Sequence, residues 1–340
     1  MALMVLSLLF LGLWASMFKA AGKWRFELFY FDFAFGLLFA AVLFAFTLGD
    51  LGYDGFSFVD DLQHAGKRQW VYCFLAGMIF NLGNMLLMGA TSVAGMSVAF
   101  PLSLGTALLL STLLGLTGKA TGNPTLILLG CVLILTSVVV NAIAYRISGV
   151  QKHEQLARAG LAKSTRRPNP LKGIVLAILS GILIGSFGGL FGRAREGDLG
   201  LGPYASAAVF AFGVFFSTFV FNIFFMNLPV EGDPVDFGAY FKSRTRQHLL
   251  GVLGGMLWFG GTLAGLVAVS VPEALQPTAL PRLLLAQGSP IIAALLGIVV
   301  WKEIRGSDVR VKILAAMMIV LFVCGLAMIG LAPLYLRKAA

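Results

Sequence analysis

The chain has 340 residues, of which 59% are hydrophobic and 12% are charged, and its mean hydropathy is +0.91. These values exclude a soluble globular domain and predict a polytopic membrane protein. The net charge of +10 would suit a nucleic-acid-binding protein, but the basic residues lie in short loops between apolar runs. This distribution favours positive-inside membrane topology, with no nucleic-acid partner.

Ten apolar runs each have roughly the ~20 residues needed to cross the hydrocarbon core. The first run is followed, not preceded, by basic residues, so it is predicted to be a true span and not a cleavable signal peptide. The predicted spans are Ala2–Phe18, Leu28–Leu48, Trp70–Thr91, Val93–Thr117, Thr125–Tyr145, Gly173–Phe191, Tyr204–Met226, Leu249–Val271, Ala279–Trp301 and Ile313–Tyr335.

Most Lys and Arg residues fall in the connections on one side of these spans, which places that side in the cytoplasm and both termini outside. The linker Ile147–Leu171 is the one long connection in the middle of the chain. Its basic composition favours a solvated cytoplasmic linker, with a lipid site as the alternative. The outer connection Gly49–Gln69 is acidic and is interpreted as a solvated loop, with a lid as the alternative.

Three short motifs recur in the same order in the two halves of the chain. They are Phe33–Gly36 with Phe210–Gly213, Ala76–Ile79 with Gly254–Leu257, and Leu113–Gly115 with Leu295–Gly297. Because each half contains five spans, a duplication places the second half upside down in the membrane. The sequence therefore predicts an all-α polytopic membrane protein of ten transmembrane helices. They form two inverted five-helix repeats, residues 1–146 and 172–340, joined by the linker 147–171, with a substrate site at the interface of the repeats.

Asp32 lies at the cytoplasmic end of the second span, flanked by aromatic residues. A carboxylate at this depth is costly unless it is paired or faces water, so it is a candidate functional group. Two interpretations stay open. Asp32 is either a proton carrier that couples transport to a gradient, or the partner of Lys19, Lys23 or Arg25 in a structural ion pair.

The ninth span is apolar enough to cross a bilayer, yet its first half carries residues that a packing helix does not need. They are Pro281, Arg282, Gln287, Gly288 and Pro290. Pro290 removes a backbone donor and Gly288 loosens the turn before it, so a break or bend is expected there. In transporters, interrupted helices face a substrate cavity, although a kinked packing helix is the alternative. Glu303, at the end of this span, is interpreted as an end cap or helix-end ion pair.

Uncharged polar and aromatic side chains indicate the kind of solute that is bound. Amides, hydroxyls and indoles with few fixed charges suit a neutral, hydrogen-bonding solute such as a monosaccharide, ureide or nucleobase. The candidate substrate-binding residues are Trp14, Asn81, Asn84, Ser103, Thr106, Trp258, Thr262, Gln287, Gly288 and Pro290. We expect Gln287 to face Trp14 and Asn84 across a cavity. For each polar residue the alternative is an interhelical hydrogen bond.

Glycines recur every four residues on two spans, at Gly181, Gly185 and Gly189 and at Gly251 and Gly255. This spacing lets helix backbones approach closely. The three cysteines fall inside apolar runs and are predicted to be packing thiols. HExxH and GxSxG motifs are absent from the sequence, so we expect neither an enzyme nor a bound metal or cofactor.

Five stretches carry a family resemblance, namely Gly12–Trp14, Tyr30–Asp32, Leu82–Asn84, Gly95–Ser103 and Ala286–Glu303. They are similar, in order and spacing, to stretches of the ureide permeases and their glucose/rhamnose porter relatives in the drug/metabolite transporter (DMT) superfamily. The resemblance implies ten helices in two inverted halves and proton-coupled secondary transport, with Trp14, Asp32, Asn84 and Gln287 near the path. The linker lacks the phosphate-loop-like motif of the plant permeases, and Ala120 stands where many superfamily members carry a glutamate.

The sequence and the resemblance together predict a secondary active transporter that takes up a small neutral polar metabolite by alternating access. The expected partners are a small-molecule substrate, protons or another coupling cation, and the lipid bilayer. We expect a monomer, with a dimer as the alternative, in a bacterial inner membrane. The competing hypothesis is a multidrug or metabolite exporter of the same superfamily.

Overall fold

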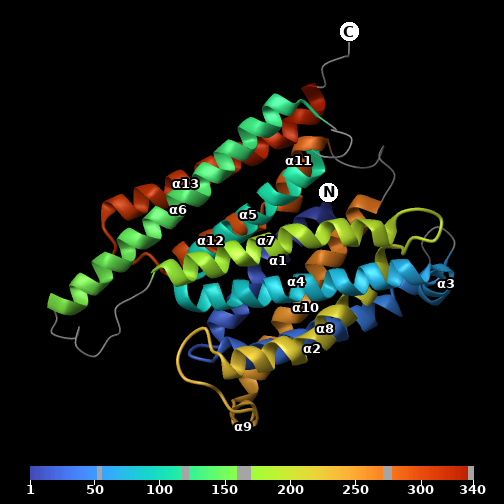
Figure 1. Ribbon diagram of the computed structural model, residues 1–340, viewed down its shortest axis with the longest axis horizontal. Helices are drawn as coiled ribbons and strands as arrows, with labels where there is room; N and C mark the ends of the chain where they lie inside the picture. The colour runs from blue at the N-terminus through green and yellow to red at the C-terminus, as the bar shows by residue number, and fades with distance from the viewer. Residues whose placement is uncertain (52–55, 117–121, 159–169, 271–277, 336–340) are drawn as a thin grey trace. The chain divides into compact units, whose positions relative to one another are not determined.

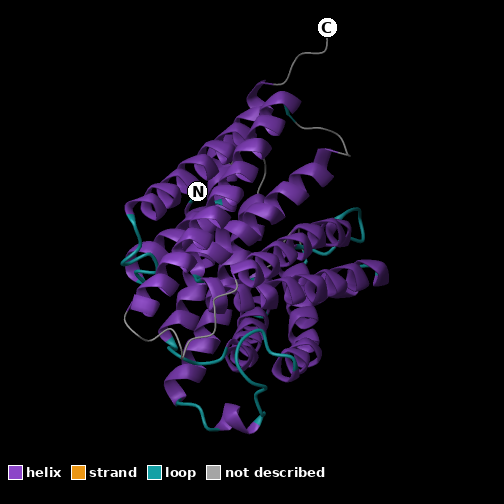
Figure 2. Cartoon of the chain, turned by 60° about the vertical axis from the view of Figure 1, so that its left-hand side comes forward, coloured by secondary structure: helices purple, strands orange, loops and turns teal. Residues whose placement is uncertain are grey.

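The computed structural model describes residues 1–51, 56–116, 122–158, 170–270 and 278–335, which fold into helices joined by short connections (Figure 1, Figure 2). The long helices are α1 (Ala2–Ala20), α2 (Phe26–Ala45), α4 (Lys67–Ala94), α5 (Met96–Leu116), α6 (Pro124–Arg158), α7 (Pro170–Arg195), α8 (Pro203–Asn227), α10 (Thr245–Ser270) and α13 (Val309–Leu331). The shorter ones are η1 (Gly49–Leu51), α3 (Phe58–His64), α9 (Gly238–Phe241), α11 (Ala279–Gln287), α12 (Ser289–Leu295), η4 (Leu296–Val300) and η5 (Ala332–Tyr335).

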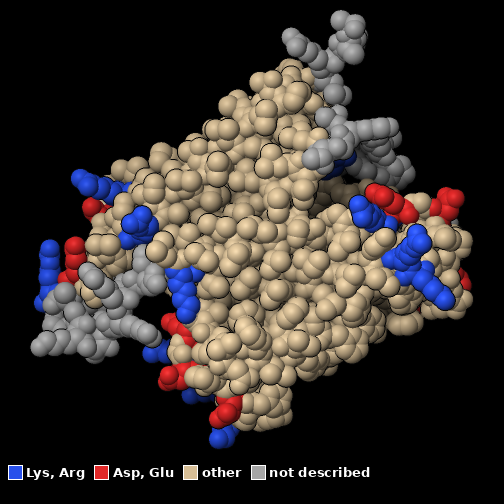
Figure 3. All heavy atoms as spheres, in the orientation of Figure 1, with Lys and Arg blue, Asp and Glu red and all other residues tan. Residues whose placement is uncertain are grey.

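The described helices have the length and surface of membrane spans. Nine are long and apolar enough to cross a bilayer, and α11 with α12 and η4 forms a bent tenth candidate. On α8, the large apolar residues Phe216, Val220 and Ile223 are 52% to 69% exposed, as side chains that face lipid would be. Charged side chains gather at the ends of the helices (Figure 3). The prediction of an all-helical, multi-pass membrane protein is confirmed for the described residues.

The fifth span continues well beyond its predicted end. The apolar run stops at Tyr145, but α6 extends to Arg158, so the first part of the predicted linker is helical. The apolar pattern marks only the part of a helix that needs lipid, whereas Gln, Lys and Glu residues sustain a helix in water. The rest of the linker up to residue 169 lies outside the described residues.

The chain divides into two compact units. Unit 1 comprises Met1–Met88 and Ser186–Gln276, and unit 2 comprises Gly89–Gly185 and Pro277–Ala340. Each unit contains helices from both sides of the linker, and the chain passes between the units within α4 and within α7. The compact units are therefore not the predicted halves, and the division into repeats at 147–171 stays a prediction.

Glycines bring the helices of unit 1 into close contact. A Cβ atom at Gly251 or Gly255 of α10 would collide with α2, so the predicted close approach along α10 is confirmed. On α7, Gly181 and Gly185 lie against α5 within unit 2 in the same way. A Cβ at Gly189 would meet nothing within 4 Å, so the expected contact ends before this third glycine.

Two matched motifs make matching contacts inside unit 1. Gly255 of α10 lies against the carbonyl oxygen of Phe33 in α2, and Gly77 of α4 lies against the carbonyl oxygen of Phe210 in α8. Phe33 and Phe210 hold the same position in one recurring motif, and Gly77 and Gly255 in another. The recurring sequence therefore coincides with a recurring helix contact.

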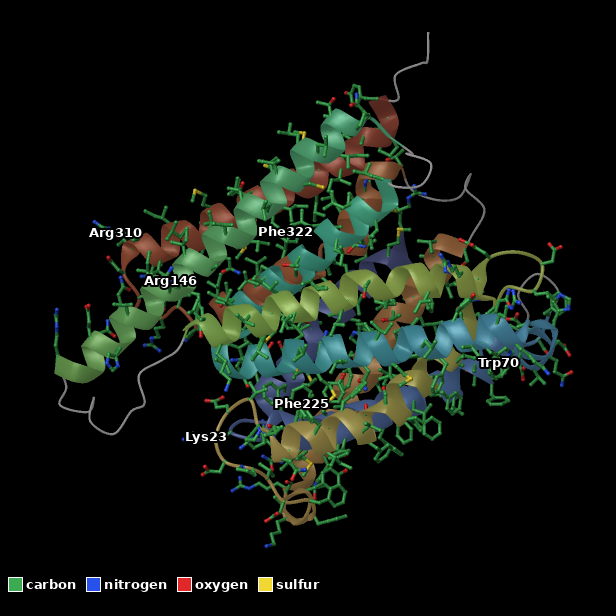
Figure 4. All side chains as sticks on the ribbon, viewed as in Figure 1. Lys23, Trp70, Arg146, Phe225, Arg310 and Phe322 are labelled. Atoms are coloured by element: carbon green, nitrogen blue, oxygen red, sulfur yellow. The ribbon has the colours of Figure 1, made fainter. Side chains whose placement is uncertain are left out.

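Unit 2 is built around α6 and α13, which pack side by side (Figure 1). Gly130 and Gly325 each lie against the carbonyl oxygen of the other, so the two backbones are close. Phe322, one turn before Gly325 on α13, is buried in an apolar cluster with Leu108 and Ile134 (Figure 4). Arg146 and Arg310 lie toward the same end of this helix pair (Figure 4).

The expected break in the ninth span is confirmed. The segments Leu280–Gln287 and Ser289–Val300 meet at an angle of 50° at Gly288. Pro290 lies in the first turn of α12, where its missing N–H costs nothing because no helical acceptor is available there.

Glu303 is a cap, but of a different helix from the one expected. Its carboxylate accepts hydrogen bonds from the backbone N–H groups of Met96 (2.9 Å) and Ser97 (2.8 Å) and from the Ser97 hydroxyl (2.7 Å). These groups form the N-terminus of α5, which follows Gly95 at φ +87°. The prediction assigned Glu303 to the end of its own span and missed the true partners, because these lie more than 200 residues away in sequence.

The acidic connection Gly49–Gln69 contains a short helix, α3, and most of its described residues are exposed or half-buried. Its interpretation as a solvated loop, with a lid as the alternative, stays a prediction. Ser57 and Asp60 form a capping box at the start of α3. Asp61 accepts hydrogen bonds from the backbone N–H of Gly202, the N-cap of α8 (3.0 and 3.2 Å). Burial raises the pKa of the Asp61 carboxyl, while this hydrogen bond opposes the shift.

Candidate functional site

Asp32 is the centre of a polar cluster in unit 1. Its side chain is 7% exposed, and each of its two oxygens has its own partner. The Tyr240 hydroxyl donates to Oδ1 at 2.6 Å, and His248 Nδ1 lies 2.8 Å from Oδ2. The sequence predicted the carboxylate correctly as a buried polar group but missed both partners. Of the basic residues expected to pair with it, Arg25 instead binds Glu27 through two hydrogen bonds.

Local structure brings the partners of Asp32 into place. His248 lies in the first turn of α10, and Tyr240 lies in the single turn α9 that precedes it. Gly251, the next residue of α10 on this face, leaves room for Asp32, because a Cβ there would approach Asp32 Cβ to 2.5 Å. Burial and the adjacent Asp32 carboxylate raise the pKa of the Tyr240 hydroxyl, so it stays protonated and donates.

Trp24 closes the cluster on the side of the α1–α2 connection. Its indole N–H donates to the Ser243 hydroxyl at 2.8 Å. Its ring meets the imidazole of His248 edge-on, with ring centroids 5.3 Å apart. The Tyr240 ring approaches the same imidazole to 4.7 Å. His248 is therefore held by two aromatic rings and one carboxylate.

A second buried network in unit 1 contains two predicted substrate-binding residues. Asn81 donates to the hydroxyls of Ser217 (2.8 Å) and Thr218 (3.1 Å) and accepts from Tyr30 (2.9 Å). Asn84 donates to the Tyr30 hydroxyl at 3.0 Å. These contacts join α2, α4 and α8. Both amides therefore make the interhelical hydrogen bonds that were the alternative to solute binding. Their binding of a solute stays a prediction.

One residue near this network has unused hydrogen-bonding capacity. Asn222 of α8 is fully buried and donates to the Glu27 carbonyl at 2.6 Å, while its Oδ1 has no hydrogen-bond partner. It lies one turn beyond Thr218 on α8. Asn222 is not among the predicted substrate-binding residues, although a polar residue that interrupts an apolar run could have indicated it.

The predicted stacking residues lie in an aromatic cluster. Trp258 is 7% exposed and packs against Phe80 and Phe210, with ring centroids 4.6 and 6.1 Å away. Trp14 is 2% exposed and packs against Phe33. Thr262 lies one turn from Trp258 on α10 and is half-buried. The two indole faces are therefore largely covered by other rings.

The remaining predicted residues belong to unit 2. Ser103 hydrogen-bonds Ser180 of α7 at 2.7 Å, whereas Thr106 donates to the Leu102 carbonyl of its own helix at 2.6 Å. Gln287 is exposed at the end of α11, directly before the bend, while Gly288 and Pro290 are buried in it. That Gln287 faces Trp14 and Asn84 stays a prediction, because these residues belong to different units.

Unit 2 also holds a cavity of about 190 Å³ that the sequence did not predict. Its polar lining comes from Ser97, Asn141, Tyr145, Ser148 and Glu303. Asn141 donates to the carbonyl oxygens of Ser97 (3.4 Å) and Val98 (3.2 Å). Proline at position 101 cannot donate to the Ser97 carbonyl, so Asn141 replaces the missing helical hydrogen bond.

The described residues contain no group of three or more His, Cys, Asp or Glu side chains that could hold a metal ion. Cys73, Cys131 and Cys324 are free thiols. Cys73 is buried within unit 1, and its thiol donates to the Ser206 carbonyl. Cys73 and Cys131 are buried and Cys324 is exposed, so the prediction of packing thiols is confirmed for the first two only.

Comparison with known proteins links the chain to two plant permeases. Ureide permease 1 of Arabidopsis thaliana is 23% identical over an alignment of 386 residues, which covers 96% of this chain and 95% of the relative. Ureide permease 2 of the same plant is 21% identical over 394 residues, with the same coverage. No protein-family model matches the chain. The chain is a multi-pass integral membrane protein with distant, full-length homology to transporters of the ureide permease type.

Proposed function

We propose that this chain is a secondary active transporter of the DMT superfamily that takes up a small, neutral, nitrogen-containing metabolite, with ureides and nucleobases as the leading classes. The observation that carries the proposal is the similarity to two ureide permeases along 96% of the chain. Homology along nearly the whole length of both chains supports a shared transport scaffold and not a shared fragment.

The polar chemistry of the spans supports a neutral solute. Ureides and nucleobases present N–H donors and carbonyl acceptors. The membrane helices offer side-chain amides that complement them, at Asn81, Asn84, Asn222 and Gln287, with hydroxyl groups beside the first two. In a bilayer these groups are costly unless they bind one another or a solute. Monosaccharides would use the same groups and form the third class to test.

The internal contacts support alternating access. Inverted repeats allow two related arrangements of the same helices, which is the basis of many carriers. The matching contacts Gly255–Phe33 and Gly77–Phe210 support such a repeat, because equivalent residues of the two halves meet equivalent partners. The break at Gly288 supports a solute site in the second half, as interrupted helices do in other carriers.

Uptake into proteoliposomes tests the proposal. Purified protein is reconstituted and offered labelled allantoin for the ureides, uracil for the nucleobases and glucose for the monosaccharides, with and without an inward proton gradient. We expect saturable uptake of one nitrogen-containing probe that the gradient raises above equilibrium.

Three results would contradict parts of the proposal. Uptake of glucose alone would overturn the substrate class, and uptake unaffected by the gradient would overturn proton coupling. Extrusion of hydrophobic dyes, with no uptake of any of the three probes, would favour the exporter. The covered faces of Trp14 and Trp258 argue against that last result, because a drug pocket needs accessible aromatic surface.

A further inference from the structure

The Asp32 cluster contains two titratable groups of unequal access to water. The Asp32 side chain is 7% exposed and that of His248 is 26% exposed, while their atoms lie 2.8 Å apart. A proton from water therefore reaches the imidazole more readily than the carboxylate. His248 is also the side chain type that changes charge near neutral pH.

The third member of the cluster fixes one side of the carboxylate. Tyr240 stays protonated and donates to Oδ1, so this oxygen is a permanent acceptor. Only Oδ2, which faces His248 Nδ1, is left to share a proton. In this geometry Tyr240 holds Oδ1, and Oδ2 is the oxygen that shares a proton with His248.

We propose that Asp32 and His248 form a single proton-binding unit, in which His248 exchanges protons with water and Asp32 orients and balances its charge. Tyr240 is a positioning residue for the carboxylate. The use of this unit in transport rests on the proposed function, whereas its proton binding does not.

Other charged groups lie on the elements packed around the pair. They are Lys19 on α1, Arg25 and Glu27 at the start of α2, Lys242 after α9, and Arg244 and Arg246 at the start of α10. Lys and Arg stay protonated near neutral pH, and Glu27 is held by two hydrogen bonds from Arg25. These groups set the local potential but do not replace His248 as the exchanging group. On α8, which also packs on α2, the uncharged Asn222 donates to the Glu27 carbonyl.

Trp24 provides a built-in reporter of this unit. Its ring lies 5.3 Å from the imidazole, and a protonated imidazole quenches a neighbouring indole. The chain has 5 tryptophans, so the Trp24 signal is obtained as the difference between the wild-type protein and W24F. This readout requires only purified, folded protein and no substrate.

We expect the Trp24 fluorescence to fall as the pH is lowered from about 8 to 5, the range in which histidine titrates. H248N should abolish this fall, because the Asn side-chain amide keeps the hydrogen bond to Asp32 but does not titrate. D32N should move the midpoint of the fall. The matched controls H64Q and H153Q, at the other two histidines, should leave the curve unchanged.

An unchanged curve in H248N would overturn the proposal, and an unchanged midpoint in D32N would show that the two residues do not act as one unit. If H248N fails to fold, H248Q gives the same comparison, since it is also non-titrating. Retained folding is checked by size-exclusion chromatography of each variant.

The transport arm uses solute exchange and gradient-driven uptake in the same vesicles. H248N should lose the pH dependence of uptake. The controls H64Q and H153Q should keep this pH dependence and should keep exchange of internal for external solute within about twofold, which corresponds to less than ~0.5 kcal/mol in the barrier. A wild-type pH profile in the residual uptake of H248N would contradict a proton-binding role. If the wild-type protein moves none of the probes, the proposed function fails, and the fluorescence titration still decides the proton-binding unit.

Discussion

A buried carboxylate of unit 1, Asp32, and a half-buried one of unit 2, Glu303, are held in different ways. In unit 2, Glu303 is bound by backbone N–H groups and a hydroxyl at the start of α5. In unit 1, Asp32 is bound by the side chains of Tyr240 and His248. Two of the donors to Glu303 are backbone N–H groups, which cannot titrate, whereas one partner of Asp32 is the imidazole that the proposal makes the proton-exchanging group. The same functional group thus serves as scaffold in one unit and as a candidate switch in the other.

The largest effect is expected where α10 makes room for Asp32. G251A places a Cβ 2.5 Å from Asp32 Cβ, so α2 and α10 must separate. Overpacking of this kind costs about 1–3 kcal/mol, and the displaced carboxylate should lose proton coupling. Thermal unfolding in detergent and proton-driven uptake measure the two effects.

The matched control for G251A is G188A on α7, where a Cβ would meet nothing within 4 Å. It should be neutral or slightly stabilising, because Ala favours a helix more than Gly does. Equal losses from the two substitutions would show that the α2–α10 contact is not specifically tight.

Sequence reasoning found the parts of this comparison that depend on local patterns. The spans follow from apolar run length, the bend at Gly288 from the adjacent Pro290, and the choice of Asp32 as a candidate from a carboxylate in an apolar helix. The partners of both carboxylates were missed. His248 is 216 residues from Asp32 and Ser97 is 206 residues from Glu303, and no local pattern links such positions.

The second prediction sharpens the structural role assigned to Glu303. E303A removes the acceptor of three hydrogen bonds at the α5 N-terminus and should cost about 1–2 kcal/mol of stability. The pH dependence of uptake should stay that of the wild-type protein, because the group is structural. An altered pH profile in a folded E303A protein would assign Glu303 to coupling and remove the contrast between the units.

A smaller effect is expected at Asn141, which compensates for Pro101 inside unit 2. N141A leaves the Ser97 and Val98 carbonyls without this donor and should cost about 0.6 kcal/mol, the average for interhelical hydrogen bonds in membranes. T136A is the control, because Thr136 is exposed and bonds only within its own helix. If T136A loses as much stability as N141A, the loss in N141A reflects helix propensity and not the interhelical hydrogen bonds.

The smallest effect concerns Asp61, in α3 of unit 1. The pKa of Asp61 is raised by burial, so the folded state binds a proton more tightly than the unfolded state. Its contribution to stability is therefore fully present below the unfolded pKa and is lost as the pH rises through the folded pKa.

D61N removes this titration but keeps an acceptor for the Gly202 N–H. The stability of the wild-type protein relative to D61N should rise slightly as the pH falls from 7 to about 4, near the ordinary pKa of Asp. D50N, at an exposed aspartate of the same connection, should show a smaller change. A relative stability that falls over this range would contradict the assigned direction.

The measurement that tests the central claim most directly compares two modes of transport in D32N. Vesicles containing the variant are assayed for solute exchange without a gradient and for accumulation driven by an inward proton gradient. If Asp32 couples protons to transport, D32N keeps exchange and loses accumulation above equilibrium. Gradient-driven accumulation at the wild-type level in D32N would contradict the account, because the buried carboxylate would then be as structural as Glu303.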